Sequence, residues 1–163
     1  SLKGGDMYQK ILVPLDGSKL AECVLEHIEQ IAKGCNTEEV ILVSVTESVT
    51  GHSLAPEVSE VYGSDVPITI GKMQRQAEKY LDRIAGRLAK KGINNIQTAV
   101  LRGNPAEEIV HYAQENDCGL IAMASHGRSG ISRWAYGSVA DKILRASPVP
   151  ILIVKAPGSV SGI

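Results

Sequence analysis

The 163-residue sequence contains no phenylalanine, and aromatic residues make up only 4% of it. A core with so few rings depends on Ile, Leu, Val and Ala, the usual residues of parallel sheets covered by helices. Hydrophobic residues amount to 44% of the chain, enough at this length to bury about two thirds of the unfolded surface. The composition therefore favours one α/β domain over an all-β sandwich or two smaller domains.

An excess of one charge sign is also lacking, because 17 Lys and Arg face 18 Asp and Glu for a net charge of −1. No continuous run of Lys and Arg indicates a nucleic-acid partner. No apolar stretch approaches the roughly 18 residues of a membrane span, and no signal peptide is recognisable. We therefore expect a cytoplasmic protein that binds neither membranes nor nucleic acid.

The cysteines are odd in number and widely spaced, at Cys23, Cys35 and Cys118. Without a C-x-x-C pair they predict neither a disulfide framework nor a zinc site. We expect reduced, structural thiols and no metal site. SLKGGD before Met7 resembles the remnant of an expression tag or a frayed start. One domain is expected over residues 7–155, followed by a flexible tail over 156–163.

Five short apolar runs alternate with longer stretches of helical period. Each run is unbroken, as expected of strands that are buried on both faces. The predicted strands are residues 10–15, 39–45, 96–101, 119–124 and 149–154.

Apolar residues at helical spacing predict four helices between these strands. Ser18 is expected to cap the first helix and Gly34 to end it, and the second ends near Gly92. Asn104 followed by proline predicts the start of the third helix. The fourth follows Gly137.

The alternation of strands and helices reads βαβαβαβαβ. Right-handed crossovers then require an essentially parallel sheet with helices on both faces. The sequence therefore predicts a doubly wound, five-stranded α/β domain. The segment 46–67 has no such pattern, and loops of that length are usually either lids over a site or mobile segments. Both alternatives stay open.

Glycines and small polar residues follow the predicted strands. In open α/β sheets, ligands bind outside the carboxyl ends of the strands, where the direction of winding reverses. Gly103 and Gly127 lie in such loops, and Gly127 allows its backbone N–H to approach an anion closely. The amides of Gly137, Ser138 and Val139 begin a helix, where the dipole favours negative charge. Together these amides predict a phosphate-binding site.

The motif H-G-x9-G-S at residues 126–138 resembles that of the universal stress protein family. VPLDGS after the first strand, RGNPAEEI after the third and SPVPILIVK at the end extend the resemblance over residues 7–155. It implies a Rossmann-like sheet of order 3-2-1-4-5, similar to the adenine nucleotide alpha hydrolases. It further implies an ATP-binding regulatory module of the stress response with an unidentified protein partner. Homodimers would form through the strand at 149–154, since two apolar edges can pair about a two-fold axis.

The resemblance also implies an adenine-nucleotide site, for ATP or for ADP or AMP, with Mg²⁺ as an optional companion. Asp16 and the backbone near Val45 would receive adenine and ribose, with Gly103 nearby. Gly127 and the start of the last helix would hold the phosphates. The implied binding residues are Pro14, Leu15, Asp16, Val45, Gly103, Met123, Ala124, His126, Gly127, Arg128, Gly137, Ser138 and Val139.

Several of these residues have simpler interpretations. Asp16 can instead cap the first helix or form an Asx-turn with Ser18, and the glycines of the phosphate loop can serve turn geometry alone. Ala124 stands where the family motif has its first glycine, which supports a second hypothesis of a dimeric scaffold without nucleotide. A third hypothesis is slow ATP hydrolysis, in which Asp16 and Ser138 share Mg²⁺ with the phosphates.

Other enzyme motifs are absent from the sequence. MASHG at 123–127 lacks the first glycine of a G-x-S-x-G nucleophile elbow, and no histidine follows His126 to complete a triad. The chain has no G-x-x-x-x-G-K-[S/T] motif for a P-loop. We therefore expect a binding module without catalytic residues.

Overall fold

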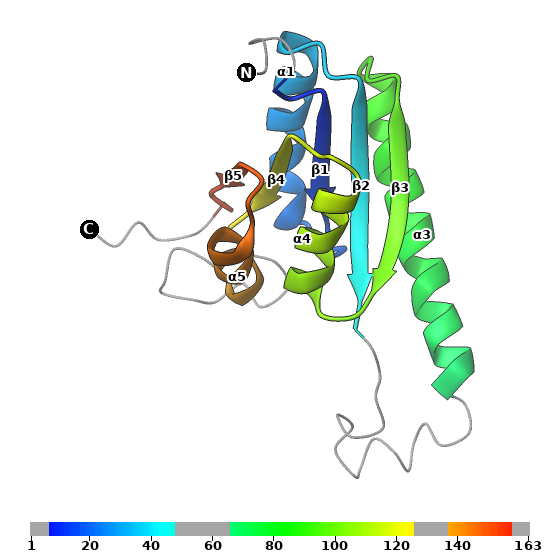
Figure 1. The fold of residues 1–163 in the computed structure, drawn as a ribbon. Helices are drawn as coiled ribbons and strands as arrows, with labels where there is room; N and C mark the ends of the chain where they lie inside the picture. Colours follow the sequence, from blue (N-terminus) through cyan, green and yellow to red (C-terminus); the bar gives the residue numbers. More distant parts are fainter. Residues whose placement is uncertain (1–6, 48–65, 126–136, 158–163) are drawn as a thin grey trace.

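A computed structural model of the chain describes residues 7–47, 66–125 and 137–157. In these ranges a five-stranded sheet is surrounded by helices (Figure 1). In chain order, the elements are β1 (Lys10–Pro14), the 3₁₀ turn η1 (Ala21–Val24), α1 (Leu25–Gly34), β2 (Glu39–Thr46), α3 (Val66–Lys90), β3 (Ile96–Arg102), α4 (Pro105–Glu115), β4 (Leu120–Ala124), α5 (Ser138–Ala146) and β5 (Ile151–Val154).

The strand order is β3-β2-β1-β4-β5, and every neighbouring pair is parallel. This confirms the predicted doubly wound sheet. The last strand begins at Ile151, two residues later than expected. Ser147 and Val149 form a turn just before it, in which the Val149 N–H donates to Ser147 Oγ at 3.0 Å.

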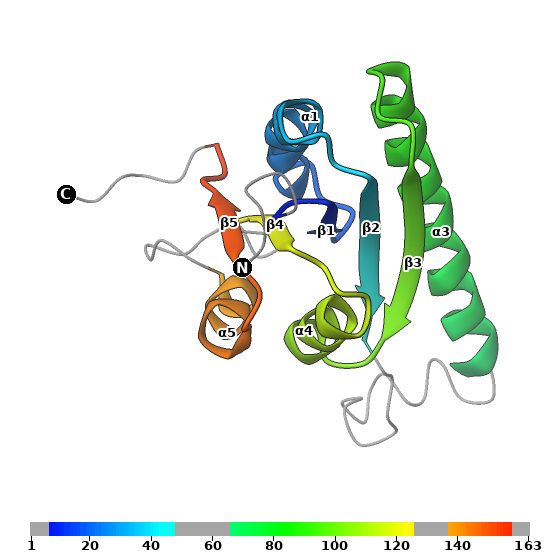
Figure 2. The same cartoon turned by 45° about the horizontal axis from the view of Figure 1, so that its top comes forward.

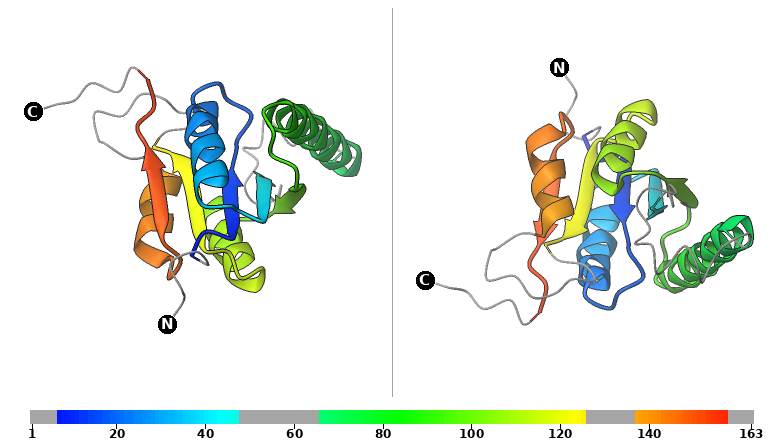
Figure 3. Two further views of the ribbon diagram at one scale, coloured as in Figure 1. Left: turned by 90° about the horizontal axis from the view of Figure 1, so that it is seen from above. Right: turned by 90° about the horizontal axis from the view of Figure 1, so that it is seen from below.

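Helices cover both faces of the sheet, α1 and α3 on one side and α4 and α5 on the other (Figures 2 and 3). Residues of β1 alternate between the two cores, because successive strand side chains point to opposite faces. Ile11 and Val13 pack with α1 and α3, while Leu12 packs with α4 and α5, and all three are fully buried. β1 therefore lies at the centre of the fold.

The start of the third predicted helix is confirmed. Asn104 is the N-cap of α4, and its side-chain oxygen accepts a hydrogen bond from the Glu107 N–H at 3.3 Å. Pro105 follows at the first helical position, where a missing N–H costs nothing. Gly92, with φ of +94°, follows the end of α3 as expected.

The predicted ends of the first helix are wrong. Ser18 does not cap α1, because its hydroxyl accepts from the Ala21 N–H at 3.2 Å and so begins the 3₁₀ turn instead. α1 itself starts at Leu25. Gly34 is the last helical residue, and the left-handed residue that follows α1 is Asn36, with φ of +51°. Asparagine tolerates this conformation through its short polar side chain.

Helix α3 is 25 residues long, which corresponds to about 37 Å. It packs on β2 and β3, and it extends past the carboxyl ends of both strands (Figure 1). No helix in the described ranges is both long and apolar enough to span a membrane.

Candidate functional site

A cavity of about 640 Å³ opens where β1, β2 and β4 end. It lies at the point where the winding of the sheet reverses, since β1 is flanked by β2 on one side and β4 on the other. Side chains of α3 and the first residues of α5 complete its walls. Its size falls within the range of small-molecule sites, roughly 300–1,000 Å³.

Nine of the residues implied for nucleotide binding line this one cavity. They are Pro14, Leu15, Asp16, Val45, Met123, Ala124, Gly137, Ser138 and Val139. The fold brings them together from three strand ends and one helix start, because the carboxyl ends of parallel strands share one edge of the sheet.

The other implied residues are placed differently. His126, Gly127 and Arg128 lie outside the described residues, as do most of the 46–67 loop and the segment up to residue 136. Gly103 is not a lining residue, although its N–H donates to the Thr46 carbonyl at 3.0 Å. Thr46 lines the cavity, so Gly103 contacts a residue of the cavity wall.

The amides at the start of α5 differ from the prediction in one respect. The Gly137 N–H donates to the Ser125 carbonyl at 2.7 Å, so it is not available to a phosphate. Ser138, Val139 and Ala140 supply the first three amides of the helix, which have no acceptor within it, and all three residues line the cavity. The unpaired amides at the start of the helix are therefore shifted one residue along the chain from the predicted ones.

Ala124 occupies the position of the motif's first glycine without strain. It is the last residue of β4 and pairs with Val154. Among the described residues, the non-glycine positions with positive φ are Asn36 and Asp117, so the backbone at Ala124 does not require glycine. Ala124 itself is a lining residue of the cavity.

The Asx-turn at Asp16 is confirmed. The Ser18 N–H and hydroxyl donate to Asp16 Oδ1 at 2.9 and 2.6 Å. These bonds hold the carboxylate at the cavity wall, where Asp16 is a lining residue. The turn and a contact with a ligand are thus compatible, and the latter stays a prediction.

One wall of the cavity comes from α3 and was not predicted as part of a site. Its residues are Met73, Gln76, Ala77 and Tyr80. Met73, Ala77 and Tyr80 follow the helical spacing of the apolar face, so the sequence indicated core packing only. Because α3 extends past the strands, this part of the apolar face borders the cavity, although Tyr80 also packs on the hydrophobic core.

Tyr80 is held in place by Glu22. Its hydroxyl donates to Glu22 Oε1 at 3.3 Å. Burial, followed by the nearby Glu22 carboxylate, raises the pKa of Tyr80 well above its ordinary value. The phenol therefore stays neutral and remains a donor throughout the physiological pH range.

The described lining residues of the cavity carry negative charge only. Asp16 and Glu47 are the ionisable carboxyl groups among the described lining residues, which include no Lys or Arg. Among the described residues, the groups left to bind an anionic ligand are therefore the backbone amides at the start of α5, assisted by the helix dipole.

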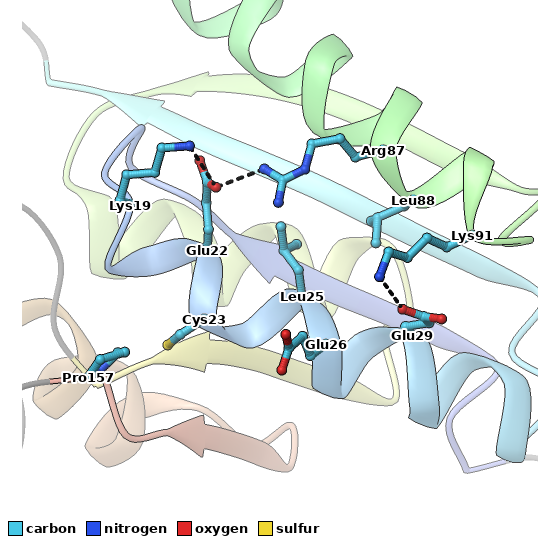
Figure 4. A pocket seen from close by; sticks show the side chains of 10 residues that line it. All are labelled: Lys19, Glu22, Cys23, Leu25, Glu26, Glu29, Arg87, Leu88, Lys91 and Pro157. Carbon is cyan, nitrogen blue, oxygen red and sulfur yellow. Dashed lines mark hydrogen bonds and ion pairs between the residues drawn. The ribbon is translucent and has the colours of Figure 1, made fainter.

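A second cavity, of about 400 Å³, lies between η1, α1 and α3 (Figure 4). Five of its six charged side chains take part in ion pairs: Glu22 contacts Arg87 at 2.8 Å and Lys19 at 3.5 Å, and Glu29 contacts Lys91 at 3.2 Å. Burial alone raises the pKa of Glu22, but Arg87 and Lys19 outweigh it and hold that pKa below its ordinary value. The pairs of Glu22 with Arg87 and of Glu29 with Lys91 join α3 to η1 and α1, and the sixth charged residue, Glu26, is exposed.

Neither cysteine nor metal chemistry is indicated in the described parts of the chain. Cys23, Cys35 and Cys118 are free thiols, and burial raises the pKa of Cys118 to about 11, which leaves it protonated and inert. No group of three or more His, Cys, Asp or Glu residues is arranged to bind a metal among the residues described.

A parallel sheet of order 3-2-1-4-5, with a cavity at its switch point beside a helix N-terminus, defines a Rossmann-like α/β domain. Comparison with known sequences identifies the family within this fold class. The universal stress protein family matches residues 7–155, and the chain belongs to this family.

Similar proteins cover nearly the whole chain. Universal stress protein MJ0531 of Methanocaldococcus jannaschii is 30% identical over 94% of this chain and 86% of its own length. YxiE of Bacillus subtilis is 31% identical over 91% of this chain and 100% of its own. The structure of MJ0577, also from M. jannaschii, superposes with a TM-score of 0.76 at 30% identity, covering 94% of this chain and 99% of the other.

Two more distant structures contain adenine nucleotides. A universal stress protein in complex with cAMP has a TM-score of 0.59 at 23% identity, with 91% of this chain and 98% of the other covered. A family protein of Arabidopsis thaliana with AMP bound has a TM-score of 0.60 at 14% identity, with 92% and 93% covered. At these identities the likeness to our chain is one of fold.

Proposed function

We propose that this protein is an ATP-binding regulatory module that acts as a homodimer and has no catalytic role of its own. The observation that carries the proposal is the cavity at the switch point of the sheet. It combines the first amides of α5 with an apolar wall from α3, which suits a ligand with an anionic end and a planar apolar end.

The residues of the cavity fit an adenine nucleotide in one orientation. The phosphates would lie against the amides of Ser138, Val139 and Ala140, and the base would lie toward β1, β2 and α3. Each hydrogen bond to a charged oxygen contributes about 1.5–3 kcal/mol. Three such bonds, with burial of the base, are sufficient for roughly micromolar affinity after the cost of association.

Ribose and Mg²⁺ have oxygen partners in the same cavity. Asp16 is fixed by Ser18 and can accept hydrogen bonds from ribose hydroxyls. Asp16 and Ser138 both line the cavity and would be the protein oxygens nearest a Mg²⁺ ion on the phosphates. The cAMP and AMP complexes of two family structures support an adenine ligand. We propose ATP in particular because the three amides at the start of α5 would offer donors to several phosphate oxygens.

Dimerisation is proposed through β5, which is an edge strand of the sheet. All four of its residues are partly exposed although all are apolar. Pairing with a second copy about a two-fold axis would cover this edge. The free thiols accord with a reducing cytoplasm as the place of action.

Calorimetric titration of the purified protein with ATP, ADP and AMP tests the proposal, after native mass spectrometry has established the mass and any retained nucleotide. We expect a dimer and micromolar binding of ATP. No binding up to millimolar concentration would favour the scaffold hypothesis. Phosphate release above the rate in buffer would instead favour slow ATP hydrolysis.

The variant Gly137→Val locates the ligand. Gly137 has φ of −68° and ψ of 164°, which valine adopts readily, so the fold should be retained. The added side chain would occupy space beside the phosphates, and we expect at least a tenfold loss of ATP affinity with little change in melting temperature. Gly34→Val, at the remote end of α1, is the matched control and should leave affinity unchanged.

A further inference from the structure

Basic residues are concentrated in α3 and the turn after it. Seven of the 17 Lys and Arg residues of the chain lie within residues 72–91, whereas Glu78 and Asp82 are the acidic residues there. This stretch therefore carries a charge of +5 in a protein whose net charge is −1. Because the bases are spaced three or four residues apart, they form no continuous run in the sequence.

On the helix, these bases form a straight stripe. At 100° per residue, six of them fall within a sector of about 120° that runs for about 27 Å. The sector is opposite Leu81, which is fully buried against the sheet. The six residues are all exposed, and we call them the basic stripe: Lys72, Arg75, Lys79, Arg83, Arg87 and Lys90.

Within the described residues, most of the basic stripe is not neutralised by acidic side chains. Arg87 pairs with Glu22 at 2.8 Å, and the Arg83 guanidinium lies 5.4 Å from the centre of the Tyr80 ring. The remaining four, Lys72, Arg75, Lys79 and Lys90, have no ion pair with any residue in the described ranges. Like charges three and four residues apart destabilise a helix, so fold stability does not account for the stripe.

We propose that the basic stripe is a docking surface for an acidic α-helix of a partner protein. Successive bases are about 4.5–6 Å apart along the axis, which matches the pitch of 5.4 Å of a second helix lying alongside. Carboxylates at every turn of that helix would each meet a base, as at the flanking positions of coiled coils. The proposal identifies the partner of the proposed regulatory module as a protein with an acidic helix. Docking of that helix does not depend on nucleotide binding.

The surroundings of the stripe favour a protein helix over other anionic partners. Glu78 and Asp82 border it along one side, both exposed, and would repel the phosphates of a wide nucleic-acid duplex. A membrane surface requires an exposed apolar face beside the charges, but Leu81, Ile84 and Leu88 of α3 are buried in the core. A narrow acidic helix avoids both conflicts.

The test uses the full chain and a synthetic peptide of about 25 residues, helical, with glutamates at alternating spacings of three and four on one face. Binding is followed by fluorescence anisotropy at about 50 mM salt, where exposed charges are weakly screened. We expect micromolar affinity for the wild type and at least a tenfold loss for K72E/K79E/K90E. The matched control R102E/K142E/K155E changes the net charge equally at exposed positions elsewhere and should stay within about twofold of the wild type.

Three results would overturn the proposal. The peptide could fail to bind the wild type, or the two triple variants could lose affinity equally. Tighter binding of a single-stranded oligonucleotide or of phosphatidylserine vesicles through the same lysines would assign the stripe to another partner. An ATP titration of the same samples distinguishes the two proposals. If the wild type binds the peptide but not ATP, only the proposed function is contradicted.

Discussion

The Tyr80 hydroxyl donates a hydrogen bond to the Glu22 carboxylate at 3.3 Å, and this contact joins the two cavities of the molecule. Tyr80 lines the cavity at the switch point, whereas Glu22 lines the groove between η1 and α3. Glu22 also contacts Arg87 and Lys19, and its side chain is only 8% exposed. The Glu22 carboxylate therefore joins η1 to α3, and so positions the α3 wall of the proposed nucleotide site.

Replacing Glu22 by glutamine should destabilise the protein. The variant keeps the shape of the side chain but loses the charge that Arg87 and Lys19 neutralise. We expect the free energy of unfolding to fall by about 1–3 kcal/mol, as for other partly buried hydrogen bonds to charged groups. Urea denaturation measures the change. Glu26→Gln, at an exposed neighbour, should stay within about 0.5 kcal/mol, and an equal effect of both variants would contradict this role of Glu22.

The contribution of Glu22 should depend on pH in a defined direction. Its pKa in the folded state lies below the ordinary value of 4.5, so the unfolded chain binds a proton at Glu22 at a higher pH than the native protein does. Stability from Glu22 is then complete above about pH 5 and is lost as the pH falls through the folded-state pKa.

Urea denaturation of the wild type and Glu22→Gln at several pH values tests this dependence. The difference in unfolding free energy should be constant from about pH 5 to 8 and should shrink below about pH 4, because only the wild type carries the titrating group. A difference that grows toward low pH would show that the pKa of Glu22 is raised in the native state.

Gly103 should not tolerate a side chain. Its φ is +142°, and an added Cβ would lie 2.8 Å from Glu108 Oε1 and 3.0 Å from Glu108 Cγ. We expect Gly103→Ala to lower the free energy of unfolding by about 1–3 kcal/mol through backbone strain, measured by thermal or urea denaturation.

The double variant G103A/E108A separates strain from steric overlap. Removing the Glu108 side chain relieves the overlap but not the backbone conformation, so most of the loss should persist relative to Glu108→Ala alone. Full recovery would show that the close contact with Glu108, not the conformation at Gly103, excludes a side chain.

The sheet was predictable because its strands are unbroken apolar runs, and Asn104 and Pro105 marked one helix start through local chemistry that needs no distant partner. The ends of α1 were not. Ser18 and Gly34 are typical capping residues, but Asp16 engages Ser18 in a turn, and Asn36 adopts the left-handed conformation two residues after Gly34. Each end of α1 offers more than one residue suited to capping, and helical spacing alone does not choose between them.

The candidate site was predictable at its strand ends and at the start of α5, but not at its α3 wall. Strand ends such as Leu15 and Val45 follow from topology, since parallel strands share one carboxyl edge. The α3 wall depends on how far the helix extends past the sheet, which helical periodicity does not encode. The bond from the Gly137 N–H to the Ser125 carbonyl likewise joins residues twelve positions apart, so the sequence did not indicate that the first unpaired amide of α5 would be that of Ser138.

Tyr80 should recognise the base of the nucleotide and not its phosphates. Its ring lines the α3 side of the cavity, whereas the amides of Ser138 and Val139 lie at the start of α5. We therefore expect Tyr80→Leu to weaken ATP binding about two- to tenfold, the worth of an aromatic contact, and to leave the affinity for tripolyphosphate unchanged. Isothermal titration calorimetry with both ligands measures the two effects.

Tyr80→Phe is the matched control for that experiment. It keeps the ring against the base but removes the hydrogen bond to Glu22, so it should retain most of the ATP affinity while losing stability. If phenylalanine weakens ATP binding as much as leucine, the hydroxyl matters and the ring contact does not. If leucine weakens ATP and tripolyphosphate equally, Tyr80 acts through the shape of the whole cavity, and the base does not lie against α3.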